Sequence, residues 1–140
     1  MKDVLLHYDK VKEKLEGDED AIEQLDMLVE EVMHNVKGDD SFDAYQLFAA
    51  LGIRPESKGK NLLVGFALGL GGESGEVLDD IKKVEYHGRN IPIEHTVEEL
   101  GDVLWYVANL ATQLGYSLSD VVTINKDKLR KRYPALYKED

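Results

Sequence analysis

Four carboxylates stand in two pairs with the same spacing. Glu73 and Glu76 are separated by two residues in GLGGESGEVLDDIKK (69–83), and Glu99 and Asp102 repeat that spacing in EELGDVLW (98–105). Residues three apart lie on the same side of an α-helix, so both carboxylates of a pair can contact one bound ion. The chain has no cysteine. Oxygen ligands alone favour Mg²⁺, with Mn²⁺ as the alternative, so the pairs indicate a divalent metal site suited to phosphate chemistry.

Both pairs border an apolar stripe in the same helical phase. Leu70, Val77 and Ile81 form the stripe beside the first pair, and Val103 and Val107 belong to the stripe beside the second. If these helices pack antiparallel, the four carboxylates converge, and a cation then offsets their mutual repulsion. The glycines at 69, 72 and 75 recur at every third position, where a missing side chain lets another helix or a phosphate approach.

Other interpretations of these residues stay open. Acidic pairs at this spacing are common on exposed helix faces, and Glu99 follows Thr96 at the spacing of a capping box. A P-loop is excluded because no Gly-Lys-Ser/Thr follows the glycines, and the dinucleotide fingerprint lacks its spacing and strand. A di-iron bundle requires Glu-x-x-His pairs, which the sequence does not contain.

Helical periodicity dominates the chain, and no stretch keeps the alternation of a strand. Helices are expected over residues 2–16, 19–36, 42–52, 61–86, 97–114 and 117–132, with loops at 54–60 and 87–96. We therefore expect an all-α helical bundle. Residues 1–38 would form an N-terminal helical extension and residues 39–140 the helical bundle that carries the two acidic pairs, within one compact domain overall.

Composition excludes several classes of function. The 140 residues carry a formal net charge of −11, which repels nucleic acid. No apolar run is long enough to span a membrane, and the N-terminus lacks the apolar core of a signal peptide. We expect a cytoplasmic protein that binds neither nucleic acid nor membranes.

Four segments together resemble a known family. They are GLGGESGEVLDDIKK, YHG, EELGDVLWYVANLATQLGYSL and NKDKLRKRYP. In this order they are similar to the MazG-like branch of the all-α nucleoside triphosphate pyrophosphohydrolases, a superfamily shared with dimeric all-α dUTPases and dCTP pyrophosphatases. The resemblance covers about residues 42–134.

The resemblance implies roles for individual residues. Glu73, Glu76, Glu99 and Asp102 match the catalytic Mg²⁺ ligands. The matching substrate-binding positions are Tyr106, Asn125 and Lys128, with Arg132 and Tyr133 as weaker candidates nearby. Helical phase favours Asp80 over Asp79 as a residue facing the site. Trp105 would stack on a base or lie buried at a subunit interface, and His87 would line the base pocket or be an ordinary loop residue.

The implied activity is hydrolysis of a nucleoside triphosphate to the monophosphate and pyrophosphate, in the service of nucleotide-pool house-cleaning. The resemblance also implies a homodimer or homotetramer whose sites involve more than one chain. The alternative is a catalytically silent helical module for interaction or regulation. The intact set of four carboxylates argues against that alternative.

Overall fold

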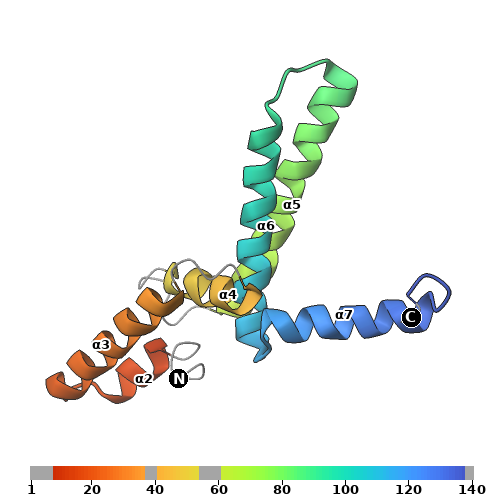
Figure 1. The fold of residues 1–140 in the computed structure, drawn as a ribbon. Helices are drawn as coiled ribbons and strands as arrows, with labels where there is room; N and C mark the ends of the chain where they lie inside the picture. The colour runs from red at the N-terminus through yellow and green to blue at the C-terminus, as the bar shows by residue number, and fades with distance from the viewer. Residues whose placement is uncertain (1–7, 37–40, 54–60, 138–140) are drawn as a thin grey trace. The chain divides into compact units, whose positions relative to one another are not determined.

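The computed structural model describes residues 8–36, 41–53 and 61–137, and every regular element in these ranges is a helix (Figure 1). The prediction of an all-α fold is confirmed. The helices are α2 (Tyr8–Lys14), α3 (Glu19–Val36), α4 (Phe42–Leu51), α5 (Leu62–His87), α6 (Ile93–Leu114) and α7 (Leu118–Arg132). The predicted loop at 54–60 lies outside the described residues.

Contacts along the chain divide it into two units, residues 1–53 and 54–140. Helix α4 therefore groups with the N-terminal helices, although the sequence analysis assigned it to the segment that begins at residue 39. The predicted boundary between residues 38 and 39 falls within 37–40, outside the described residues, and stays a prediction.

The N-terminal unit contains α2, α3 and α4. Lys12 on α2 donates hydrogen bonds to both carboxylate oxygens of Asp26 on α3, at 2.8 and 2.9 Å. Leu25 and Val29 on α3 are buried. The break between the two helices lies at Gly17, whose φ of 97° suits glycine. The helices predicted over residues 2–16 and 19–36 thus correspond to α2 and α3, and the predicted residues before Tyr8 lie outside the described part of the chain.

The second unit is built on a hairpin of α5 and α6, which lie side by side and antiparallel (Figure 1). Asn61 caps the start of α5, where its side-chain oxygen accepts a hydrogen bond from the Val64 backbone N–H at 3.2 Å. The helix ends at Gly88, which adopts a left-handed φ of 60°. Ser117 and Asp120 form a capping box at the start of α7, close to the predicted helix start.

Helix α6 begins earlier than the sequence analysis predicted. The predicted loop extended to Thr96, but α6 starts at Ile93, directly after Pro92 at the N-cap position. Proline fixes φ and favours helix starts, and Glu94 in the first turn interacts well with the helix dipole. Because α6 starts at Ile93, His95 and Thr96 lie inside the helix. Thr96 is therefore not an N-cap, and the capping-box interpretation of Glu99 is wrong.

Gly69 on α5 lies beneath the aromatic ring of Tyr106 on α6. A Cβ atom at residue 69 would lie 2.0 Å from the Tyr106 Cε1 atom, far inside van der Waals contact. No atom lies within 4 Å of the equivalent position at Gly72 or Gly75. The glycine at 69 is thus explained by close packing within the hairpin.

Part of the apolar stripe is exposed. Leu78 and Ile81 on α5 are 70% and 56% exposed, and Leu100 and Leu104 on α6 are 52% and 37% exposed. By helical phase, Ile81 and Leu100 turn to one side of the hairpin, and Leu78 and Leu104 lie at the edges of that side, turned further from the partner helix. We call these four residues the apolar hairpin face.

No helix among the described residues combines the length and apolarity needed to cross a membrane.

Candidate metal centre

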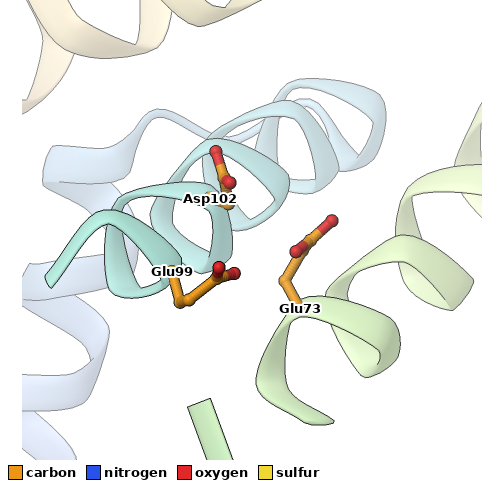
Figure 2. Close-up of side chains that lie close together, drawn as sticks. All are labelled: Glu73, Glu99 and Asp102. Atoms are coloured by element: carbon orange, nitrogen blue, oxygen red, sulfur yellow. The ribbon is translucent and has the colours of Figure 1, made fainter. Parts of the chain in front are cut away.

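Three of the four predicted ligands meet between α5 and α6. Glu73 projects from α5 towards Glu99 and Asp102 on α6 (Figure 2). One carboxylate oxygen from each residue lies within 4.8 Å of those of the other two. Oxygens at such separations can coordinate one divalent cation after small rotamer changes. The antiparallel pairing of two stripes in the same phase produces this convergence.

Glu76 is the fourth predicted ligand, and it is not a member of this three-residue cluster. Its side chain is exposed, one turn after Glu73 on α5. The charge of Glu76 nevertheless contributes to the raised pKa of Glu73, so the two carboxylates are electrostatic neighbours. The structure therefore brings three of the predicted ligands together and leaves the fourth beside them.

The electrostatics of the cluster suit a cation. Burial raises the pKa of Glu73 above its ordinary value, and the negative charges of Asp102, Glu99 and Glu76 raise it further. A bound divalent cation would reverse the sign of this field and favour the ionised carboxylates. The donor set is oxygen only, as Mg²⁺ and Mn²⁺ prefer. The residues present therefore fit a divalent cation.

Replacing Glu73 with glutamine should stabilise the metal-free protein. Because the pKa of Glu73 is raised in the folded state, the folded protein binds a proton at this carboxyl more readily than the unfolded chain does. As pH rises through the folded pKa, Glu73 ionises and the free energy of unfolding falls. We expect the Tm of Glu73→Gln to exceed that of wild type at pH 7 in EDTA. The difference should shrink as pH falls towards the ordinary glutamate value of 4.5.

Comparing wild type with Glu73→Gln in the presence of Mg²⁺ tests whether Glu73 is a metal ligand. Mg²⁺ should raise the Tm of wild type more than that of Glu73→Gln, because the variant lacks one anionic ligand. Differential scanning fluorimetry measures both comparisons. A Glu73→Gln variant with a lower Tm than wild type in EDTA would contradict the electrostatic account.

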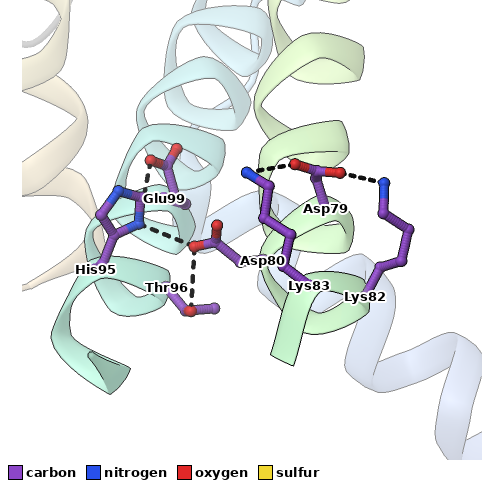
Figure 3. A network of polar contacts seen from close by, with 7 residues as sticks. All are labelled: Asp79, Asp80, Lys82, Lys83, His95, Thr96 and Glu99. Atoms are coloured by element: carbon purple, nitrogen blue, oxygen red, sulfur yellow. Dashed lines mark hydrogen bonds and ion pairs between the residues drawn. The ribbon is translucent and has the colours of Figure 1, made fainter. Parts of the chain in front are cut away.

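Asp80 lies deeper in the hairpin than the cluster does, with a side chain only 5% exposed. Its Oδ2 atom accepts a hydrogen bond from the Thr96 hydroxyl at 3.3 Å and lies 2.9 Å from Nδ1 of His95 (Figure 3). The neighbouring Asp79 instead pairs with Lys82 and Lys83 on its own helix, and these hydrogen bonds lower its pKa to about 2. Asp80 therefore contacts α6 and Asp79 does not, and a contact between Asp80 and substrate stays a prediction.

Tyr106 and Trp105 form an aromatic group with Phe66 of α5. The ring of Phe66 makes edge contacts with Trp105 and Tyr106, at centroid distances of 5.8 and 6.3 Å. Both α6 rings are partly exposed. They therefore stabilise the hairpin and retain surface that a nucleotide could contact.

The remaining predicted residues are exposed and lie outside the cluster. Asn125 and Lys128 are on α7, as are Arg132 and, just after its end, Tyr133. His87 lies in the last turn of α5, beside an open depression lined by Lys82, Lys83 and Arg89. Their contacts with substrate stay predictions.

Sequence reasoning missed His95 and Thr96. The predicted loop placed His95 outside the helices, whereas His95 contacts carboxylates on two helices, Asp80 on α5 and Glu99 on α6. Pro92 followed by Glu94 was the signal that could have placed both residues inside α6.

Comparisons with known proteins agree with this geometry. Residues 66–137 match the MazG nucleotide pyrophosphohydrolase domain, which includes all of α6 and α7 and most of α5. The Gene 37 protein of Mycobacterium phage L5 is 36% identical over 98 residues, covering 64% of this chain and 86% of the phage protein. No solved structure matches the chain. Because the domain match spans half of the chain and contains the whole carboxylate cluster, the chain belongs to the MazG nucleotide pyrophosphohydrolase family.

Proposed function

We propose that this protein hydrolyses nucleoside triphosphates between the α- and β-phosphates in a reaction that depends on Mg²⁺ or Mn²⁺. Water adds to the α-phosphorus, the bond from that phosphorus to the bridging oxygen breaks, and the products are the monophosphate and pyrophosphate. The convergence of Glu73, Glu99 and Asp102 from two helices carries the proposal. Membership of the MazG family supports it.

In the proposed reaction, residues of α5 and α6 would hold the cation, and residues of α6 and α7 would contact the nucleotide. Glu73, Glu99 and Asp102 would hold the cation, with Glu76 as the adjacent fourth ligand. A cation bound there supplies charge neutralisation for the triphosphate and Lewis acidity. Lys128 would supply a positive charge to the departing phosphates and Asn125 a hydrogen bond to the sugar or a phosphate. The aromatic surface of Tyr106 and Trp105 would contact the nucleotide.

A nucleotide panel tests this activity. Pyrophosphate release is measured from ribo- and deoxyribonucleoside triphosphates with Mg²⁺, with Mn²⁺ and with EDTA, and ³¹P NMR identifies the products. We expect pyrophosphate and monophosphate, only with metal. The ranking of substrates would test a house-cleaning role. Inactivity on standard nucleotides, modified bases and alarmones would favour the interaction module instead.

We further propose that a second copy of this chain covers the apolar hairpin face. Large apolar side chains clustered on one face of a helix pair mark interaction sites, and burying them against an identical face gives a symmetric dimer. Because the face belongs to the same two helices that carry the ligands, the dimer contact would also support the metal centre.

A charge placed on the apolar hairpin face should disrupt the dimer. We expect Leu78→Glu to sediment as a monomer, whereas Leu68→Glu should sediment as wild type. Leu68 serves as the control because it is on α5 outside the apolar hairpin face and is 72% exposed, compared with 70% for Leu78. Analytical ultracentrifugation measures both. A monomeric wild type, or a Leu78→Glu variant that stays dimeric, would contradict the proposed contact.

A further inference from the structure

Asp80 is a buried carboxylate outside the ligand cluster. Its side chain is 5% exposed, whereas that of Asp79, the next residue along, is 31% exposed. A buried carboxylate is costly unless other groups hydrogen-bond to it. Its two side-chain partners, His95 and Thr96, are both on α6, so Asp80 joins the two helices.

Those partners stand close to a candidate metal ligand. His95 Nδ1 lies 2.9 Å from Asp80 Oδ2 and 3.7 Å from Glu99 Oε1, so the same edge of the ring approaches both carboxylates (Figure 3). The longer distance exceeds a hydrogen bond but permits electrostatic contact. Glu99 follows His95 by one helical turn, and the side chain of Glu99 therefore lies over the turn that Asp80 anchors.

Building on the proposed function, we propose that Asp80, His95 and Thr96 form a positioning network for Glu99. The network ties the first turn of α6 to α5 in the register that brings Glu99 opposite Glu73. It also places the imidazole ring against the Glu99 carboxylate and so limits the rotamers of that side chain. Groups that orient metal ligands in this way affect metal affinity by about 10- to 100-fold.

Mn²⁺ binding followed by electron paramagnetic resonance tests the network without relying on activity. The full chain is compared as wild type, Asp80→Ala, His95→Ala and His95→Gln. We expect the Kd for Mn²⁺ to rise by about 10-fold or more in the two alanine variants. His95→Gln should recover part of the affinity, because its amide can still donate a hydrogen bond to Asp80.

Asp79→Ala is the matched control. It removes one negative charge from the adjacent residue of the same helix. Asp79 forms ion pairs with Lys82 and Lys83 of α5 and is not part of the proposed network. We expect the Kd of Asp79→Ala for Mn²⁺ to match that of wild type. If the loss of one negative charge alone weakened Mn²⁺ binding, the Kd of this variant would rise as well. Thermal unfolding in EDTA sets a measuring temperature at which every variant is folded.

Each contrary outcome has a distinct meaning. Folded His95→Ala and Asp80→Ala variants with wild-type Mn²⁺ affinity would overturn the positioning role and leave the proposed function intact. Affinity lost in Asp80→Ala but retained in His95→Ala would also overturn it, because His95 would then have no positioning effect on Glu99. A wild type that binds no Mn²⁺ would overturn both proposals. If Asp80→Ala does not fold, Thr96→Val removes one hydrogen bond with little change of shape, and its Kd should still rise.

Discussion

Glu99→Gln is expected to lose at least about 100-fold in kcat/KM for metal-dependent pyrophosphate release. Stabilisation of developing charge by a catalytic cation is worth several kcal/mol, and each 1.4 kcal/mol corresponds to about a factor of ten in rate. Glutamine keeps the shape of the side chain but removes the anionic oxygen that faces Glu73 and Asp102. The loss should therefore reflect the missing ligand rather than altered packing.

Glu98→Gln provides the control for that result. It removes the same charge one residue earlier on α6, from an exposed side chain that is not part of the cluster. Steady-state kinetics over a range of Mg²⁺ concentrations should place Glu98→Gln close to wild type. Equal losses in the two variants would show that activity follows overall charge, and the assignment of Glu99 as a ligand would fail.

Gly69→Ala should give the largest loss of stability among single alanine substitutions at the glycines of α5. The new Cβ atom would overlap the Tyr106 ring, which also packs edge-on against Phe66 and Trp105 and therefore has little freedom to move. Overpacking of this kind costs about 1–3 kcal/mol. Chemical denaturation followed by circular dichroism measures the free energy of unfolding.

Two comparisons separate overpacking from helix propensity. No atom lies within 4 Å of a Cβ atom built at Gly71, so Gly71→Ala should stabilise the protein by about 0.5–1 kcal/mol through propensity alone. Gly69→Ala should lose its penalty in a Tyr106→Ala background, because the two substitutions act at one contact. A stabilising Gly69→Ala would show that α5 and α6 do not pack in this register.

Much of the hairpin could be predicted because its signals are local. The predicted helix starts near Asn61 and Ser117 agree with the structure, where both side chains cap the first turn of a helix. The equal phase of the two acidic pairs also anticipated the meeting of Glu73 with Glu99 and Asp102. These inferences need only helical geometry.

The remaining features depend on neighbours that periodicity does not identify. An apolar stripe shows that a face must be covered, but not which residues the partner helix reaches, so the exposure of Leu78 could not be predicted. Gly69 was read as a place of close approach, but the approaching group, Tyr106, follows only from the register of the hairpin. The contacts of Asp80 with α6 likewise needed the correct start of α6.

The most direct test of the metal centre is an anomalous difference map from crystals of the full chain grown with Mn²⁺. We predict a peak within coordinating distance of carboxylate oxygens from Glu73, Glu99 and Asp102, and no such peak from crystals of Glu99→Gln. A map with these three side chains ordered and no peak among them, or with Mn²⁺ bound only elsewhere, would contradict the account.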